Sequence, residues 1–350
     1  MATLLAITDS LIFKIILLLV GFVLLIKGAD IFVEGSSSIA KKLKVPPLII
    51  GMTIVAMGTS LPEAAVSIAA SMNNANSLAV SNVVGSNIFN LMMVLGTCAL
   101  FNKLRVSNDV LKRDYPFSII CAVLMIFLGV FGFLPDGSYG MNWEIGREAG
   151  IIYLVLFIAF ITVLIISALK ARKKASETGV AAERSLADEM EDEVAEHPVW
   201  KSILFIILGA VAIKFGGDWV VDGATAIASA IGVSDTIIGL TICAVGTSLP
   251  ELVTSIVAAR KNQLDMAIGN VVGSNVFNIL FVLGLAATIS PIPFSIENVI
   301  DIGILIFFSV LIYIFCITKK AINKIEGAIM VALYVLFMVY VCLRETGMFA

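Results

Sequence analysis

The chain has 350 residues, of which 59% are hydrophobic and only 14% are charged, and its formal net charge is −3. Soluble domains carry about 25% charged residues, so this composition, with a mean hydropathy of +1.04, excludes an ordinary soluble domain and a disordered chain. The slightly negative charge also provides no basic surface for nucleic acid. The sequence therefore predicts a protein of the cell membrane, with membrane lipid as its surroundings and no nucleic-acid partner.

Ten segments along the chain are apolar over about the 20 residues that a helix needs to cross a bilayer. The predicted spans are 11–40, 47–71, 79–100, 117–134, 150–168, 201–230, 235–259, 267–290, 301–317 and 327–343. The first and sixth are unusually long, and we expect both to be interrupted. The predicted fold is an all-α polytopic membrane protein with ten transmembrane helices.

Lysine and arginine residues are concentrated in alternate connections between these spans. Basic clusters follow the first, third, fifth, seventh and ninth spans, whereas the other connections and the chain ends contain few basic residues. Because positive residues favour the cytoplasmic side, the pattern predicts a multi-pass protein with both its N-terminus and its C-terminus outside the cell.

The longest polar stretch lies between the fifth and sixth spans. It begins with the basic residues of 170–174 and becomes acidic over 183–196. We interpret 171–200 as a solvated cytoplasmic linker, and a weak cation-sensing role for 183–196 remains an alternative. His197, the only histidine, lies at its end, and we expect no transport role for it.

The sequence contains an internal repeat. When the chain is shifted by 188 residues, 51–96 aligns with 239–284 without a gap, and 26 of the 46 positions are identical. Each half has five spans, and five is odd, so the second half enters the membrane from the opposite side. We therefore predict two inverted five-helix repeats, 1–170 and 201–350. Many secondary transporters have this architecture and bind their substrate between the repeats.

The strongest repeated motif is Gly-Thr-Ser-Leu-Pro-Glu, at 58–63 and again at 246–251. Pro62 cannot donate a backbone hydrogen bond, so the helix is expected to break there and to leave carbonyl groups around Ala56 to Thr59 free. Thr59, Ser60 and Glu63 then share one helical face. The second repeat is expected to present the same oxygens, from Ala244, Thr247, Ser248 and Glu251.

These groups are hard oxygen ligands, and no histidine or cysteine joins them, so Na⁺, Ca²⁺ and Mg²⁺ fit better than zinc or copper. Two carboxylates match one divalent cation, and Mg²⁺ gives up its water reluctantly, which favours Ca²⁺. An acidic residue at a span centre costs on the order of 3 kcal/mol to insert. Neither motif contains a basic residue at matching depth, so we assign Glu63 and Glu251 to function.

A second repeated motif, Gly-Ser-Asn-x-Phe-Asn, lies at 85–90 and 273–278. Ser86 with Asn90, and Ser274 with Asn278, are four residues apart and lie on one helical face. Small and polar residues in spans also serve helix packing alone. For six polar residues of these spans, helix packing alone is as good an explanation as ion binding: Ser67, Ser255, Asn82, Asn270, Asn87 and Asn275.

With both motifs present twice at mirrored positions, the sequence resembles the cation/calcium exchanger superfamily, and more specifically the compact prokaryotic sodium/calcium exchangers. The resemblance covers nearly the whole chain. It implies an antiporter that exchanges Na⁺ for Ca²⁺ by alternating access, with no cofactor beyond these transported ions.

The resemblance also implies residue roles. Glu63 and Glu251 would be ligands of both ions, and the main-chain oxygens of Thr59 and Thr247 would help to bind Ca²⁺. The flanking Na⁺ sites would be completed by Ser60, Ser248, Ser86, Ser274 and the carbonyl groups of Ala56 and Ala244. Asn90 and Asn278 would line the central position.

Two alternatives within this class concern the counter-ion. Potassium-dependent relatives carry an aspartate at the position of Asn278, so this residue disfavours K⁺ coupling. Proton-coupled relatives tend to have Gly-Asn-x-x-Glu where this chain has Gly-Thr-Ser-Leu-Pro-Glu, so the motif favours Na⁺ over H⁺. A Ca²⁺ antiporter coupled to H⁺ or K⁺ remains the second hypothesis.

Two other classes of function are disfavoured. A passive cation channel does not fit an inverted repeat with one central carboxylate pair. An enzyme does not fit either, because the sequence contains no nucleophile–base pair, phosphate loop or metalloprotease motif. The sequence leaves open the stoichiometry, the affinities, the physiological direction, the discrimination among divalent cations and the oligomeric state.

Overall fold

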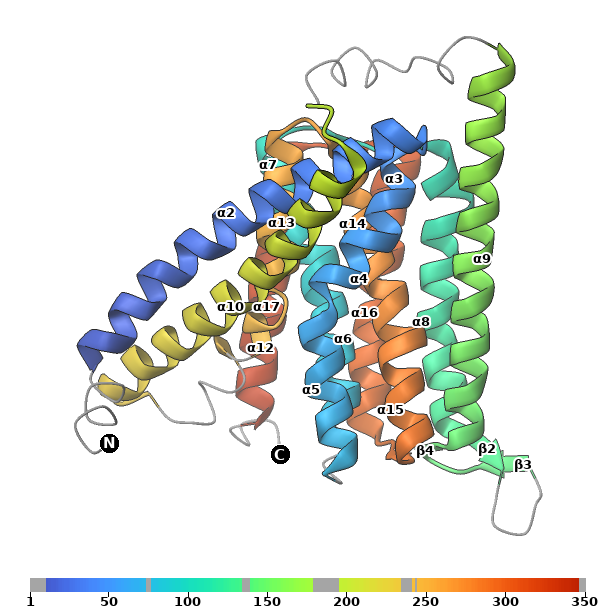
Figure 1. The fold of residues 1–350 in the computed structure, drawn as a ribbon. Helices are drawn as coiled ribbons and strands as arrows, with labels where there is room; N and C mark the ends of the chain where they lie inside the picture. Colours follow the sequence, from blue (N-terminus) through green and yellow to red (C-terminus); the bar gives the residue numbers. More distant parts are fainter. Residues whose placement is uncertain are drawn as a thin grey trace.

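A computed structural model describes residues 11–73, 77–133, 139–178, 195–233, 241–242 and 244–345, and over these ranges the chain is almost entirely helical (Figure 1). Within them, eight helices are long and apolar enough to span a membrane, or nine if the bent pair Pro47–Thr59 and Leu61–Met72 forms one span. The predicted span 235–259 lies partly outside the described residues. The total of ten spans therefore stays a prediction.

The first half of the chain forms one long helix followed by a set of upright helices. Its helical segments are α2 (Leu11–Leu43), α3 (Pro47–Ile50), η1 (Gly51–Val55), α4 (Ala56–Thr59), α5 (Leu61–Met72), α6 (Ser77–Ile88), η2 (Phe89–Val94), α7 (Leu95–Phe101), η3 (Val110–Asp114), α8 (Tyr115–Val130) and α9 (Arg147–Thr178). The segments η1, η2 and η3 are π-helical turns within longer helices.

The second half follows a similar order. Its helical segments are α10 (Val199–Ala230), α12 (Ala244–Gly246), α13 (Leu249–Arg260), α14 (Leu264–Phe277), the π-helical η6 (Asn278–Leu283), α15 (Gly284–Ile289), α16 (Ile296–Lys319) and α17 (Lys324–Glu345). In Figure 1, α2 begins and α17 ends near the lower end of the molecule, whereas α9 ends and α10 begins near the upper end.

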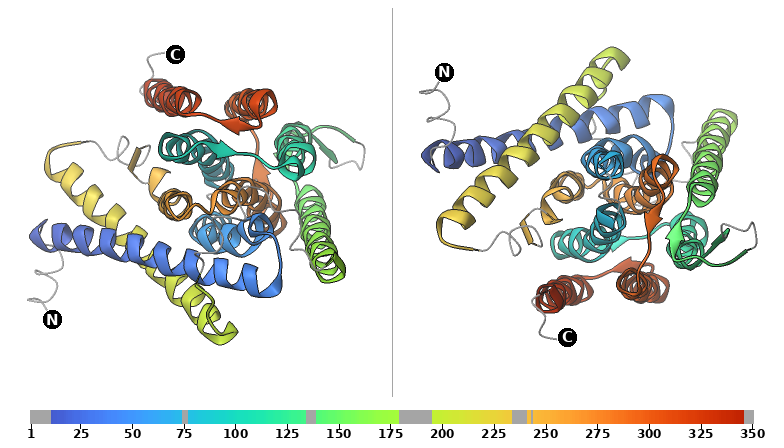
Figure 2. Two further views of the ribbon diagram at one scale, coloured as in Figure 1. Left: turned by 90° about the horizontal axis from the view of Figure 1, so that it is seen from above. Right: turned by 90° about the horizontal axis from the view of Figure 1, so that it is seen from below.

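The expectation that the first and sixth spans are interrupted was wrong. Both α2 and α10 are single helices of 33 and 32 residues, and they cross each other along one side of the bundle (Figure 2). Glycines of both helices lie in the crossing. An added Cβ on Gly28 would lie 2.8 Å from Ala212 Cβ, and one on Gly21 would lie 2.9 Å from the carbonyl oxygen of Gly216. Small residues permit such close approach of membrane helices.

We expect Gly28→Val to force α2 and α10 apart. Its side chain would overlap the backbone of α10, because the amide nitrogen of Ile213 lies 2.9 Å from the position of an added Cβ. Overpacking of this kind costs about 1–3 kcal/mol, and the predicted result is a lower midpoint of thermal unfolding in detergent. Gly303→Val is the control, since an added Cβ on Gly303 meets nothing within 4 Å. An equal effect of both substitutions would contradict this explanation.

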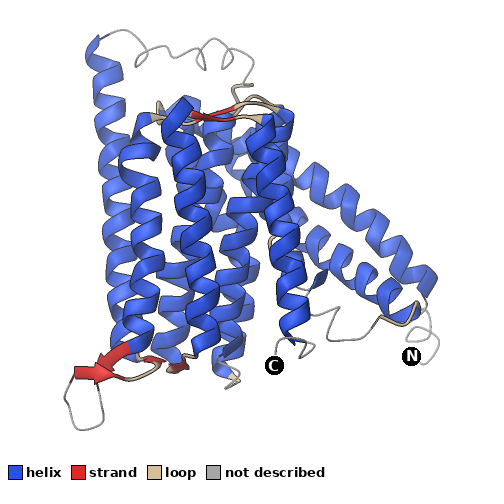
Figure 3. Ribbon diagram, turned by 180° about the vertical axis from the view of Figure 1, so that it is seen from behind, coloured by secondary structure: helices blue, strands red, loops and turns tan. Residues whose placement is uncertain are grey.

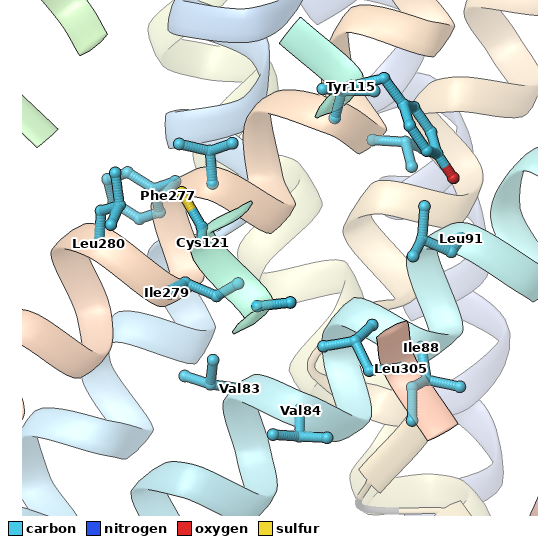
Figure 4. Packing of buried hydrophobic residues seen from close by; sticks show 14 of the residues in the cluster. Val83, Val84, Ile88, Leu91, Tyr115, Cys121, Phe277, Ile279, Leu280 and Leu305 are labelled. Atoms are coloured by element: carbon cyan, nitrogen blue, oxygen red, sulfur yellow. The ribbon is translucent and has the colours of Figure 1, made fainter. Parts of the chain in front are cut away.

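The upright helices pack around a continuous apolar core. Side chains of α6, α8, α14, η6 and α16 meet there, among them Val84, Cys121, Phe277 and Leu305 (Figure 4). The outward faces of the long helices expose large apolar side chains such as Ile158 and Phe307. A helix that is apolar on its outer face suits a lipid environment.

Short strands lie at the ends of the bundle, which the all-α prediction did not anticipate (Figure 3). The antiparallel pairs are β1 (Leu104–Arg105) with β6 (Ala321–Ile322), β2 (Phe131–Phe133) with β3 (Tyr139–Met141), and β4 (Glu144–Ile145) with β5 (Ile292–Pro293). Connections that are too short for a helix satisfy their backbone groups by pairing with each other. Helix α9 continues to Thr178, which lies within the predicted linker. Residues 183–194 of the acidic stretch lie outside the described residues.

Candidate cation site

Two short helices begin near the middle of the bundle, each directly after a helix break. α4 ends at Thr59 and α5 starts at Leu61, with a bend of 48° between them. Pro62 lies in the first turn of α5, as Pro250 does in α13, and neither can donate a backbone hydrogen bond to the preceding turn. The break predicted from the first motif is therefore present. From these breaks, α5 runs toward the lower end in Figure 1 and α13 toward the upper end.

Glu63 and Glu251 occupy the first turns of these two helices, and both side chains are fully buried. Each binds a serine of the other repeat: Ser248 Oγ donates to Glu63 Oε1 over 3.0 Å, and Ser60 Oγ donates to Glu251 Oε1 over 2.6 Å. A carboxylate in the first turn of a helix is also stabilised by the helix dipole. The two carboxylates are thus held in place by one another's motifs.

The second oxygen of each carboxylate has no hydrogen-bond partner within the described part of the chain. This holds for Glu63 Oε2 and Glu251 Oε2, and neither side chain forms an ion pair with a described basic residue. Leaving a buried charge without a partner is costly. Both positions therefore offer a negative oxygen that a cation can satisfy.

Asn90 and Asn278 lie where π-helical turns begin, and both are fully buried. Asn90 Nδ2 donates to Asn275 Oδ1 over 3.3 Å, and Asn278 Nδ2 donates to Asn87 Oδ1 over 3.1 Å. Their own Oδ1 atoms have no partner among the described residues. These bonds use the donor side of each amide and leave the acceptor side free.

Asn87 and Asn275 connect the two halves of the chain as well. Asn87 Nδ2 donates to the Asn275 carbonyl over 3.2 Å, and Asn275 Nδ2 donates to the Asn87 carbonyl over 3.4 Å. Sequence reasoning gave packing equal weight for these residues and missed that they orient Asn90 and Asn278. The signal was their exact recurrence at a separation of 188 residues in the second motif.

The remaining predicted ligands lie around the two breaks. Ser86 Oγ donates to Glu63 Oε1 over 3.5 Å, and Ser274 Oγ donates to the Ala56 carbonyl over 3.4 Å. Thr59 Oγ1 donates to Asn270 Oδ1 over 3.2 Å, while Thr247 Oγ1 has no partner in the described ranges. Ala244 begins α12, and its side chain lies outside the described residues.

The expectation of a free carbonyl group was wrong at Ala56. Its oxygen accepts the Ser60 amide over 3.1 Å, because the turn before the break keeps its helical hydrogen bond. A carbonyl oxygen has two lone pairs, and the Ala56 oxygen also accepts the hydroxyl groups of Thr59 over 3.3 Å and Ser274 over 3.4 Å.

Asn82 and Asn270 take part in equivalent packing contacts. Asn82 Nδ2 donates to Ser67 Oγ and Asn270 Nδ2 to Ser255 Oγ, each over 2.9 Å. These bonds join α5 to α6 and α13 to α14. Packing explains all four residues, and they hold the helices that carry the two glutamates.

The set of groups is suited to a hard cation. Glu63, Glu251, Ser60, Ser248 and Ser86 are brought together by direct hydrogen bonds, and all of their polar side-chain atoms are oxygens. No group of three His, Cys, Asp or Glu side chains with metal-binding geometry occurs in the described ranges. These oxygen donors are of the type that Ca²⁺ and Na⁺ prefer, and the five residues lack the nitrogen and sulfur ligands that zinc prefers.

Comparisons with known proteins agree with this chemistry. A family model described as "Sodium/calcium exchanger protein" matches residues 13–166 and 201–343. The sodium/calcium exchanger MaX1 of Methanosarcina acetivorans is 35% identical over 342 residues, covering 93% of this chain and 97% of the relative. The inner membrane protein YrbG of Escherichia coli is 39% identical over 278 residues, covering 79% of each chain.

A solved structure is similar over almost its full length. The sodium–calcium exchanger NCX_Mj, soaked with Na⁺ and Sr²⁺, superposes with a TM-score of 0.77 at 30% sequence identity, covering 94% of this chain and 99% of that chain. The helical membrane fold described above is therefore shared with a solved exchanger.

Proposed function

The chain belongs to the sodium/calcium exchanger family, and on this premise we propose that it is a secondary antiporter that exchanges Na⁺ for Ca²⁺ by alternating access. The family consists of membrane transporters, so the chain is a multi-pass membrane protein of the cation-exchange class and not an enzyme. The coupling to Na⁺ and the access mechanism are the parts that we propose.

One observation carries the proposal: two buried glutamates each present an oxygen atom that has no partner in the described chain. Burying such charges in a membrane protein is expensive, and intramembrane carboxylates usually mark an ion pathway. Two negative charges balance one Ca²⁺ or two Na⁺. A pair of shared carboxylates therefore makes the two ions compete for the same ligands.

We assign the remaining ligands by their position around this pair. Ca²⁺ binds between Glu63 and Glu251 with the main-chain oxygens of Thr59 and Thr247, and Na⁺ occupies flanking positions that share the same carboxylates. The flanking ligands are Ser60, Ser248, Ser86, Ser274 and the carbonyl groups of Ala56 and Ala244. Asn90 and Asn278 line the centre with their unpartnered Oδ1 atoms, and this feature supports the assignment.

We further propose that the two halves, 1–170 and 201–350, are inverted repeats joined by the linker, giving ten spans with both chain ends outside. Reciprocal contacts support this arrangement. Ser60 binds Glu251 as Ser248 binds Glu63, and Asn90 binds Asn275 as Asn278 binds Asn87. Access changes when the crossed pair α2 and α10 slides against the helices that carry the site.

The experiment that tests the counter-ion is ⁴⁵Ca²⁺ uptake by the purified protein in liposomes under an imposed Na⁺, K⁺ or pH gradient. We expect uptake to follow the Na⁺ gradient and to be unchanged when K⁺ is replaced by choline, because Asn278 adds no negative charge for a K⁺ ion. Uptake driven by the pH gradient, or strictly dependent on K⁺, would instead support the second hypothesis.

Asn278→Asp provides a matched test of this position. The variant adds an ionisable group beside a site that already holds two carboxylates, so we expect slower Na⁺-driven uptake at an unchanged protein yield. Asn323→Asp is the control, since Asn323 immediately precedes α17 and its Oδ1 accepts the Glu326 amide over 3.0 Å. Faster uptake by Asn278→Asp without K⁺ would contradict the proposed charge balance.

A further inference from the structure

A cluster of charged side chains joins the crossed helices to the bundle at one end of the molecule. Lys261, the residue that follows α13, places its Nζ 2.7 Å from Asp30 Oδ1 and 3.0 Å from the Asp30 carbonyl oxygen. Glu34 lies one turn further along α2, and its Oε2 is 3.9 Å from the same Nζ. Lys261 is therefore held by α2 through side-chain and main-chain oxygens.

The same glutamate connects α2 to the start of α10. Glu34 Oε1 lies 2.6 Å from His197 Nε2, and the amide of His197 donates to Ser38 Oγ over 2.9 Å. Ser202 in α10 donates to Ser38 as well, over 3.0 Å. These bonds make α2 and α10 one unit at this end, and Lys261 ties that unit to α13.

At the other end of the molecule, the described residues form no equivalent contact, although the sequence repeat places acids there. Asp218 and Asp222 align with Asp30 and Glu34, but the residue that aligns with Lys261 is Asn73. Asn73 Nδ2 donates to Ala69 of its own helix over 2.8 Å. Asp218 pairs with Lys214 on its own helix, and Asp222 is exposed. Among the residues that the structure describes, the charged link between the crossed helices and the bundle is thus present at only one of the two ends.

We propose that Lys261, with Asp30 and Glu34, forms a one-sided latch that holds the crossed pair α2 and α10 against the bundle and biases the protein toward the access state of this structure. The inference rests on the proposed alternating-access function. Lys261 acts as a positioning residue, because it touches neither the carboxylate pair nor the asparagines.

The bias follows from the geometry of the contact. A slide of α2 past α13 by more than a few ångströms must break the 2.7 Å pair, whereas the Lys214–Asp218 pair lies within one helix and moves with it. The side chains of Lys261 and Asp30 are about one-third and two-fifths exposed (34% and 42%). For a partly exposed pair, we expect an effect on the population ratio of the two access states of about three- to fivefold.

The test is a distance measurement between spin labels at Ile12→Cys and Met72→Cys, in full-length protein whose five native cysteines are replaced by alanine. Both labelled positions are exposed, on the crossed pair and on α5. Distances are recorded in lipid nanodiscs at one fixed ion composition. The variant is Lys261→Asn, which installs the residue found at the equivalent position 73. The control is Lys214→Asn, which breaks the Lys214–Asp218 ion pair within the single helix α10.

We expect Lys261→Asn to increase the less populated of the two spin-label distances about three- to fivefold. Lys214→Asn should leave the distance distribution unchanged. The double variant Asp30→Lys with Lys261→Asp, which exchanges the two charges, should restore the wild-type distribution. An unchanged distribution in Lys261→Asn would overturn the latch. A shift that the charge exchange does not reverse would overturn the ion pair as its cause. The spin-label experiment does not measure transport. Failure of Na⁺-driven uptake would therefore contradict the proposed function, but the distance distributions would still test the latch.

Discussion

Replacing either buried glutamate by glutamine is expected to abolish Ca²⁺ uptake. The substitution keeps the size and one carbonyl oxygen of the side chain but removes half of the site's charge. Oε1 of each glutamate accepts a serine hydroxyl, while Oε2 is the oxygen that remains for a cation. Because unbalanced charge in a buried site is worth several kcal/mol, we expect transport to fall on the order of 100-fold or more for Glu63→Gln and for Glu251→Gln.

The matched control is Glu297→Gln. Glu297 also lies in the first turn of a helix, but its side chain is exposed at the start of α16. Equilibrium ⁴⁵Ca²⁺ binding and gel filtration, made on the same preparations, separate loss of ligand from loss of fold. Wild-type uptake by either buried-site variant would remove the carboxylate pair from the mechanism.

The location of these glutamates could be predicted from the sequence because every signal for it lies within a few residues of each glutamate. An acid in an apolar span needs a partner, a proline removes a helical hydrogen bond, and Gly58 to Glu63 recurs at Gly246 to Glu251. Local signals of this kind also predicted the bend between α4 and α5. They place the residues correctly on their helices without giving any contact between the two halves.

The contacts between distant residues could not be predicted in the same way. The donation of Ser60 to Glu251, and the role of Asn87 in orienting Asn278, depend on how two remote segments face each other. The first span illustrates the difference, because we expected it to be interrupted, whereas α2 is one continuous helix that contains Gly28. The neighbours of Gly28 in α10 show that this continuous helix uses the absence of a side chain for close packing.

Lys261 is a second example. Lys261 and Asp30 are more than 200 residues apart in the sequence, and no local sequence pattern predicts their contact. The asymmetry between Lys261 and Asn73 is nevertheless visible in the repeat alignment. Differences between two copies of a repeat are therefore as informative as the identities, once the structure shows which residues they face.

The second large effect concerns the coupling of the two ions. If the site is empty and ionised, two carboxylates remain buried without counter-charge, which costs several kcal/mol. The access-switching state is then expected to form readily with Ca²⁺ or Na⁺ bound and poorly without either. This penalty would make transport an obligatory exchange, because the protein could not return empty.

The most direct measurement of this central claim is ⁴⁵Ca²⁺ efflux from loaded liposomes into three media, containing Na⁺, containing unlabelled Ca²⁺, or containing neither. We predict rapid efflux into the first two media and efflux at least about tenfold slower into the third, since a penalty of 1.4 kcal/mol already gives a factor of ten. Equal efflux into all three media would show that the switch needs no bound cation, and the exchanger mechanism would have to be replaced by a uniporter or a channel.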